Sequence, residues 1–261
     1  MTTAASAEAV VVDRLSVRHG STVACDSISL RVLKGDVFAL LGRAGAGKSS
    51  LLACIAGRLK PSSGSARVFG ADSRKDRRRL RALVAEIDGR SGRASEEIFS
   101  KALDKGARLL LIDQPHTQVE SVRLGIQADQ IQRAVLAGAT TLIATRIPSS
   151  AEAFGARSVG LLVAGKLVLQ GEIADLRARF RRIRYRNEMT QTRTDYGTEL
   201  DLFDAVRVRV RGWGTEAIVS NFSSELLERL RRTDGVADVS QEPMTLEDLF
   251  EAVSPVRPVS A

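Results

Sequence analysis

Long apolar segments are missing from this sequence. No run approaches the ~18 consecutive apolar residues that a membrane-spanning helix needs, so we expect any membrane role to depend on a partner. The first ten residues also lack a basic region followed by an apolar stretch, and we therefore expect no signal peptide. We see no internal repeat.

Cysteine is scarce as well. The two cysteines, Cys25 and Cys54, lie in apolar surroundings and do not have C-x-x-C or metal-ligand spacing. This pattern predicts buried small hydrophobic residues rather than a redox or zinc site. It is typical of a reducing compartment.

Acidic residues are outnumbered by basic ones, which gives a formal net charge of +8. Such a balance suits an acidic partner such as a nucleotide, an anionic lipid surface or nucleic acid, but it also serves solubility. Arginine is concentrated in residues 74–81 and 177–193. The first segment fits a solvated helix face or a patch for nucleic acid or lipid, and the second fits a linker or an exposed helix.

One stretch carries a specific chemical signal. Residues 42–49 read GRAGAGKS, the G-x-x-x-x-G-K-S pattern of a phosphate-binding P-loop. An apolar run at residues 36–41 predicts a buried strand before it, and residues 49–57 predict a helix after it that ends at Gly57. The motif therefore lies on the strand-to-helix turn that its mechanism requires.

The residue types in this loop suit the binding of phosphate. Glycines let successive N–H groups point at phosphate oxygens, and the following helix adds the positive end of its dipole. A lysine can reach the β- and γ-phosphates, and the serine hydroxyl can ligate Mg²⁺. The candidate nucleotide-binding residues are Gly42, Arg43, Ala44, Gly45, Ala46, Gly47, Lys48, Ser49 and Ser50.

A second candidate lies at the end of the apolar run 108–114, where Asp113 follows four apolar residues. A buried strand that delivers an acid beside the phosphates is typical of P-loop proteins, in which the acid holds Mg²⁺ directly or through water. We expect Ser49 and Asp113 to hold Mg²⁺.

The order of elements predicts the fold. Strands alternate with helices from residue 36 onward, which favours an α/β P-loop NTPase core with a mostly parallel sheet. Before it, apolar and polar residues alternate up to Val32, as in an antiparallel β part. We expect the core at residues 1–176, a basic linker at 177–204 and a small C-terminal α+β domain at 205–254, whose last helix starts with a capping box at Thr245.

The motifs, their order and the ending resemble the ATP-binding subunit of an ABC transporter. The tail, Pro243 to Phe250, resembles the ending of subunits that serve ABC-2-type exporters. The resemblance is strong at residues 10–70 and 108–176 and weak between them. It implies ATP and Mg²⁺ as cofactors, a transmembrane permease and a second ATP-binding subunit as partners, and a cytoplasmic position at the inner face of the membrane.

The middle of the chain departs from that family. Only 65 positions separate Lys48 from Asp113, and no L-S-G-G-Q signature occurs between them. Residues 89–93 (GRSGR) fall where the signature would be, and the family's helical subdomain is missing. Glu86 is the candidate to replace the family's glutamine beside Mg²⁺.

Three positions of the nucleotide site also depart from the family. Gln114 stands where the family has a catalytic glutamate, and a neutral amide cannot take a proton from water at neutral pH. Arg146 stands where the family has a switch histidine, and it keeps its charge at all relevant pH values. His19 replaces the aromatic residue that stacks on adenine, or is simply a turn histidine.

These departures predict a degenerate subunit that binds ATP–Mg²⁺ but hydrolyses it slowly or not at all, beside an active partner. Two alternatives stay open. The chain is an active transporter ATPase in which Gln114 and Arg146 take new catalytic roles. Or it is a nucleotide-gated scaffold whose arginine-rich segments, with Phe180 and Tyr185 in the second, hold anionic membrane or nucleic acid.

Overall fold

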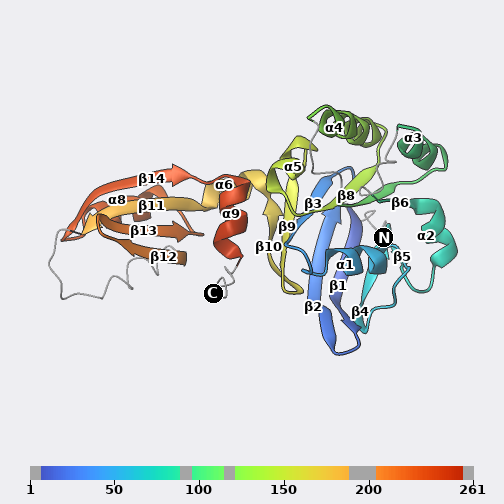
Figure 1. Ribbon diagram of the computed structural model, residues 1–261, viewed down its shortest axis with the longest axis horizontal. Coiled ribbons are helices and arrows are strands. Elements are labelled where there is room, and N and C mark those ends of the chain that lie inside the picture. The colour runs from blue at the N-terminus through green and yellow to red at the C-terminus, as the bar shows by residue number, and fades with distance from the viewer. Residues whose placement is uncertain (1–6, 89–95, 115–120, 188–203, 255–261) are drawn as a thin grey trace, which may run out of the picture. The chain divides into compact units, whose positions relative to one another are not determined.

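The computed structural model describes residues 7–88, 96–114, 121–187 and 204–254 (Figure 1). The chain forms two compact units, residues 1–171 and 172–261.

The first unit begins with an antiparallel sheet, as expected. Its strands, in the order β2-β1-β4-β5, are β1 (Glu8–His19), β2 (Thr22–Leu33), β4 (Ser63–Val68) and β5 (Ala71–Asp72). Ile28, Leu30 and Val32 are buried while the residues between them are exposed. The alternation in the sequence therefore sets the face that this sheet turns to the core.

A six-stranded sheet forms the centre of the unit. Its order is β10-β9-β3-β8-β7-β6, with β3 (Val37–Leu41), β6 (Val84–Asp88), β7 (Leu109–Asp113), β8 (Thr140–Thr145), β9 (Ser158–Val163) and β10 (Lys166–Glu172). Strands β6, β7, β8, β3 and β9 run parallel in that order. All residues of β3 and β8 are buried, which explains their continuous apolar runs, because helices or the other sheet cover both faces.

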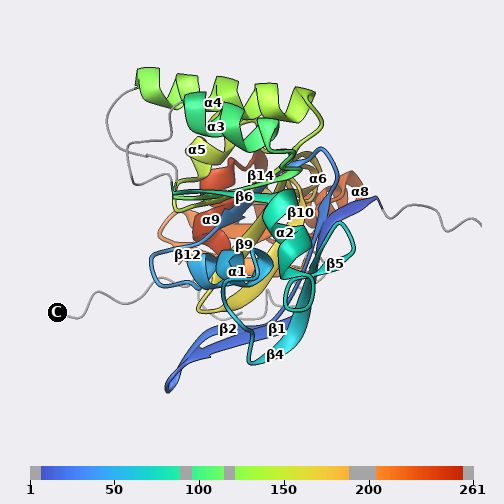
Figure 2. The same ribbon diagram turned by 90° about the vertical axis from the view of Figure 1, so that its right-hand side faces the viewer.

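Helices cover this sheet on both faces (Figures 1 and 2). They are α1 (Lys48–Ile55), α2 (Arg77–Leu83), α3 (Glu96–Asp104), α4 (Ser121–Leu136) and α5 (Pro148–Ala153). One core lies between α1, the antiparallel sheet and the central sheet. A second core, which includes Phe99 and Phe154, joins α3, α4 and α5 to the opposite face.

The shortened middle of the chain lies between β6 and β7. Its described part contains α3, of nine residues. Residues 89–93, which align with the missing signature, lie outside the described residues.

The second unit is a four-stranded antiparallel sheet with helices. It contains α6 (Ile173–Arg179), β11 (Arg181–Asn187), β12 (Ala205–Arg211), β13 (Gly214–Val219), α8 (Ser224–Arg231), β14 (Val236–Pro243) and α9 (Leu246–Val253). The strand order is β12-β13-β11-β14. Leu227 and Leu230 of α8 pack on Ile183, Tyr185 and Val219 to form the core of this unit.

The expectation of a linker over residues 177–204 is wrong for its first part. Residues 181–187 form β11, an inner strand that pairs with β13 on one side and β14 on the other. Ile183 and Tyr185 are buried at alternate positions, as in a β-strand with one face toward the core. The alternation of buried and exposed residues therefore indicates the strand, whereas the high arginine content wrongly suggested a linker. The rest of the expected linker, residues 188–203, lies outside the described residues.

The capping box that the sequence predicts for the last helix is confirmed. The Asp248 backbone N–H donates to Thr245 Oγ1 at 3.1 Å, and the Thr245 backbone N–H donates to Asp248 Oδ2 at 3.0 Å. Leu246 and Leu249 then face the interior, as their spacing requires.

Candidate nucleotide-binding site

The P-loop joins β3 to α1 and lies close to other backbone segments. A Cβ atom at Gly47, whose φ is +100°, would lie 2.0 Å from the carbonyl oxygen of Ala24. One at Gly42 would lie 2.6 Å from the carbonyl oxygen of Leu162. Glycine is therefore required at both ends of the loop by packing, and at Gly47 also by conformation.

The loop leaves the start of α1 open to an anion. Gly47 is the N-cap residue of this eight-residue helix, and no described side chain caps it. The backbone N–H groups of a first helical turn lack intrahelical acceptors, and the helix dipole is positive there. Arg43, Ala44 and Gly45 are exposed, so the loop presents its backbone to a ligand.

Lys48 is buried beneath this loop. Its side chain is 4% exposed, and Nζ donates to the carbonyl oxygens of Gly42 at 2.7 Å and Arg43 at 3.0 Å. Burial lowers the pKa of Lys48 to about 8, against the effect of Asp113, which raises it, while Arg146 lowers it further. The structure thus brings together three residues that the sequence marks separately.

Asp113 ends β7 at the same edge of the sheet. Its Oδ1 atom is buried and has no hydrogen-bond partner among the described residues. A buried carboxylate oxygen without a partner is costly unless it meets a cation or a donor. Together with the exposed Ser49 at the start of α1, this oxygen fits a site for Mg²⁺ held beside phosphates.

Gln114 follows Asp113 in a strained conformation. Its φ is +51°, and its backbone N–H donates to the carbonyl oxygen of Ala144 at 2.8 Å. Residues other than glycine rarely adopt positive φ, and strain of this kind gathers at functional sites. Arg146, one residue beyond the end of β8, is exposed and forms no ion pair within the part of the chain that the structure describes.

Glu86 has a different partner from the one we expected. Its carboxylate accepts hydrogen bonds from Arg58 Nε at 2.7 and 2.6 Å and also meets Arg58 Nη2. Two residues later, Asp88 ends β6 and stands in register with Asp113 on the neighbouring strand. Asp88 was not among the predicted site residues; its position at the end of a parallel strand was the signal that could have identified it.

His19 lies beside the P-loop helix. Its Nε2 atom is 3.0 Å from Ser50 Oγ, so the ring at the end of β1 stands next to the start of α1. Nearby, the Cys25 thiol lies 3.6 Å from the carbonyl oxygen of Gly47. Burial raises the pKa of Cys25 to about 12, with a further rise from Cys54, and burial raises that of Cys54 to about 11, so both thiols stay protonated.

No cluster of three or more histidine, cysteine, aspartate or glutamate side chains occurs among the described residues. A metal ion at this site would therefore depend on a small protein ligand set, Ser49 and Asp113. Mg²⁺ bound to a nucleotide commonly has such a set, because phosphate and water supply the other ligands.

Residues 25–135 match the family model of the ABC transporter. The phosphonates import ATP-binding protein PhnC of Pseudomonas putida is 45% identical over 76 residues, which are 28% of each chain. The methionine import ATP-binding protein MetN of Rhizobium etli is 42% identical over 69 residues, which are 26% of this chain and 19% of that protein. The matched segments thus span about a quarter or less of these relatives.

Solved structures extend the likeness in fold. An ATP-binding cassette of an ABC transporter in its ADP conformation superposes with a TM-score of 0.56 at 15% identity, over 63% of this chain and 91% of that chain. At this identity the likeness concerns the fold. It covers the α/β cassette with its antiparallel sheet, to which this chain adds a C-terminal antiparallel sheet.

Proposed function

We propose that this chain, whose first unit is an ATP-binding cassette of the ABC transporter kind, is the nucleotide-binding subunit of an ABC-type transport complex. The observation that carries the proposal is the P-loop with buried Lys48 beside the unpartnered carboxylate oxygen of Asp113. The phosphates of a nucleoside triphosphate would pair with the Lys48 ammonium, and its Mg²⁺ ion would pair with the Asp113 carboxylate.

Each residue of the site has a distinct part in binding. The N–H groups at the start of α1 and the Lys48 ammonium hold the phosphates. Ser49 and Asp113 would hold Mg²⁺, which supplies charge neutralisation at the phosphate oxygens. The His19 ring would stack on the base, a role supported by its position 3.0 Å from Ser50 Oγ at the start of α1.

The site lacks the general base that the family uses for hydrolysis, because Gln114 stands in the position of the catalytic glutamate. Gln114 can orient a water molecule through its amide but cannot accept a proton from it. General-base help is typically worth about 10²–10⁴-fold in rate. We infer that the chain holds ATP with slow or no turnover and acts as the degenerate partner of an active ATP-binding subunit.

The complex that we propose includes a permease. Among the described residues no helix is both long and apolar enough to cross a membrane. In the proposed complex the chain lies on the cytoplasmic face, where the permease holds it at the membrane. The tail resemblance at residues 243–250 favours an exporter, whereas the two relatives named above are import proteins that match over 28% and 26% of this chain.

A second candidate function is a working ATPase with substituted residues. It is favoured by the influence of Arg146 on Lys48, which places the guanidinium within electrostatic range of the phosphate site. A fixed positive charge there can stabilise charge on a transferring phosphoryl group. In that case Arg146, rather than Gln114, carries the catalytic effect.

The scaffold alternative is weakened for the second of its two arginine-rich segments. Phe180 and Tyr185 are 4% and 2% exposed, so neither ring is available to stack on a base. Residues 74–81 keep their exposed basic side chains and remain a candidate surface for an anionic partner.

The test is ATP binding and turnover by the purified chain, with Lys48→Ala as the control. We expect Mg²⁺-dependent binding that Lys48→Ala weakens by at least about 100-fold, and turnover far below an ordinary enzyme rate of about 1–10³ s⁻¹. Turnover near 1 s⁻¹ that is lost in Lys48→Ala and in Arg146→Gln would establish the second candidate instead. No binding in either protein would refute both.

A further inference from the structure

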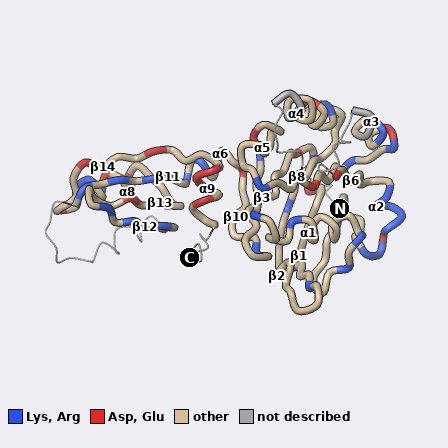
Figure 3. The backbone as a smooth tube through the Cα atoms, in the orientation of Figure 1, with Lys and Arg blue, Asp and Glu red and all other residues tan. Residues whose placement is uncertain are grey.

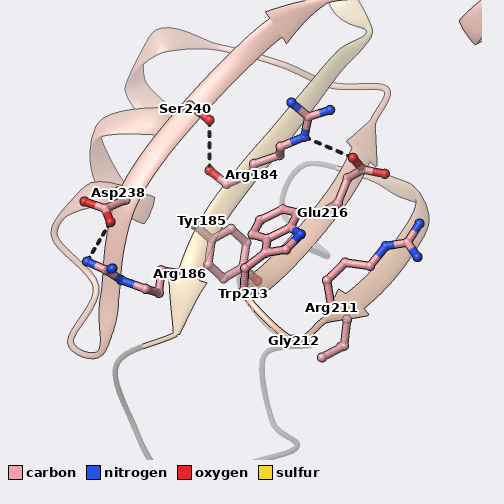
Figure 4. Close-up of a pocket in the computed structure, with 11 residues that line it drawn as sticks. Arg184, Tyr185, Arg186, Arg211, Gly212, Trp213, Glu216, Asp238 and Ser240 are labelled. Atoms are coloured by element: carbon pink, nitrogen blue, oxygen red, sulfur yellow. Dashed lines mark hydrogen bonds and ion pairs between the residues drawn. The ribbon is translucent and has the colours of Figure 1, made fainter.

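The second unit contains a pocket of about 1040 Å³ that the proposed nucleotide site does not use (Figure 4). It lies on the sheet near the β12–β13 hairpin and has polar and apolar walls. Its volume is at the upper end of the range that small-molecule sites occupy. Its charged and aromatic lining side chains come from Arg184, Tyr185, Arg186, Arg211, Trp213, Glu216 and Asp238.

Two of its three arginines are already neutralised. Arg184 donates to Glu216 Oε2 at 3.0 Å and to Glu242 Oε1 at 2.6 Å, and Arg186 Nη2 lies 2.6 Å from Asp238 Oδ2. These pairs fix both guanidinium groups on the strands that carry them. They leave some N–H donors of each group without a carboxylate, because a guanidinium has five.

Arg211 is the exception. It ends β12, is exposed and has no ion pair or side-chain hydrogen bond among the described residues. In Figure 4 its guanidinium stands apart from the Glu216 carboxylate, and no interaction links the two. Among the three arginines that line the pocket, Arg211 is thus the one without a carboxylate partner in the described part of the chain.

Trp213 supplies a flat apolar surface in the same pocket. It is 50% exposed and lies between Gly212 and Gly214 at the hairpin turn. At Gly214 a Cβ atom would lie 2.2 Å from the carbonyl oxygen of Tyr185, so this glycine allows the hairpin to approach β11 closely. The turn that presents the indole is therefore held against the sheet.

We propose that this pocket binds a small ligand that joins one anionic group to a planar ring, of the mononucleotide class. The anion meets the guanidinium of Arg211, which suits a phosphate or carboxylate through paired N–H donors. The ring stacks on the indole of Trp213. Arg184 and Arg186 already have carboxylate partners, so Arg211 is the lining arginine left for one anionic group; we therefore expect the site to prefer a monophosphate to a triphosphate, unlike the P-loop.

The sequence offers a direct probe of this site, because Trp213 is the only tryptophan of the chain. We suggest titrating AMP against the fluorescence of Trp213 in a full-length Lys48→Ala background, so that the P-loop contributes little binding. Adenosine and inorganic phosphate, titrated separately, represent the ring and the anion alone. We expect AMP to give a saturable change and each half to bind at least about tenfold more weakly.

The variant Arg211→Gln tests the anion contact, and Arg78→Gln, which removes an exposed arginine of the first unit, is the matched control. We expect Arg211→Gln to weaken AMP binding about tenfold, the loss of one charge-assisted contact, and Arg78→Gln to leave it unchanged. Calorimetry on Trp213→Leu, which lacks the fluorescent group, should show a similar loss. Circular dichroism establishes that the variants are folded.

Three results would overturn the proposal. They are no saturable change with millimolar AMP, equal AMP binding by the Arg211→Gln variant and its parent, and tighter binding of ATP than of AMP.

Discussion

Lysine and arginine occur along both units of this chain (Figure 3), but particular basic residues of the two units have different partners. In the second unit Arg182, Arg184 and Arg186 of β11 meet carboxylates on neighbouring elements, such as Arg182 with Asp248 at 2.7 Å and Arg184 with Glu216 at 3.0 Å. In the first unit Lys48 donates to carbonyl oxygens, and Arg146 has no ion pair among the described residues. Residues 74–81 likewise expose their basic side chains.

This difference shows that arginine density alone does not identify a binding surface. The two arginine-rich segments look equivalent in composition, yet residues 181–187 of the second form an inner strand with three ion-paired arginines, whereas residues 74–81 form an exposed loop and helix. A paired cation stabilises the fold, whereas a cation held without a carboxylate is available to an anionic ligand. Substitutions of paired cations should therefore affect stability, and those of unpaired cations should affect binding.

The largest effect on stability should come from Arg184. Replacing it by leucine leaves Glu216, whose side chain is 17% exposed, without its cation and leaves Glu242 with Arg182 alone. We expect a loss of about 1–3 kcal/mol in the free energy of unfolding, less than for a fully buried pair because Arg184 is partly exposed. Urea denaturation at neutral pH, followed by circular dichroism, measures it.

Arg78→Leu is the matched control for Arg184→Leu, since Arg78 is exposed on α2 and has no ion pair among the described residues. Its effect should stay within about 0.5 kcal/mol. Equal losses in the two variants would contradict the distinction between paired and unpaired arginines.

A smaller effect should appear in the pH dependence of nucleotide binding. Burial, with a contribution from Arg146, lowers the pKa of Lys48 to about 8. If the charged ammonium is the form that binds phosphate, affinity falls about tenfold between pH 7 and pH 9, as the lysine loses its proton. Titration of the chain with ADP and Mg²⁺ across this range measures the fall.

Arg146→Gln removes one cause of the lowered pKa of Lys48, so the loss of affinity should begin at a higher pH in that variant.

The lowered pKa of Lys48 in the parent chain also affects the pH dependence of its stability. The unfolded chain holds this proton up to a higher pH than the folded chain does, so stability rises as the pH increases from about 8 toward the ordinary lysine pKa. A variant whose binding profile matches that of the parent chain would contradict the role given to Arg146.

The sequence predicted the first unit well and the second unit only in part. The P-loop letters, the apolar run before Asp113 and the alternation in β2 are local patterns, and each fixes its element directly. The strand β11 was missed because its arginines find their carboxylates on β13, β14 and α9, and such partners are far away in the sequence. For the same reason the sequence could not show that Glu86 pairs with Arg58, or that Asp88 stands beside Asp113.

The smallest expected effect concerns Asp248, which takes part in two contacts that hold α9. It forms the capping box with Thr245 and an ion pair with Arg182. Burial would raise its pKa, but hydrogen bonds from Thr245 and Arg182 hold that pKa below its usual value. A carboxyl group with a lowered pKa in the folded state adds stability above its unfolded pKa of about 3.9, and the contribution disappears as the pH falls through the folded value.

Asp248→Asn should therefore destabilise the chain by about 1 kcal/mol at neutral pH, the usual size of a lost cap or charged contact. The difference from the parent chain should shrink below about pH 4, where the carboxyl group of the parent becomes protonated too. Glu247→Gln removes the neighbouring acid of the same helical turn, which has no contact to Arg182 or Thr245 among the described residues. Its stability should stay within about 0.5 kcal/mol of the parent at neutral pH. Urea denaturation at pH 7 and at a series of pH values below about 4 separates the two variants. A difference for Asp248→Asn that does not shrink along this series would show that its carboxylate charge is not what stabilises α9.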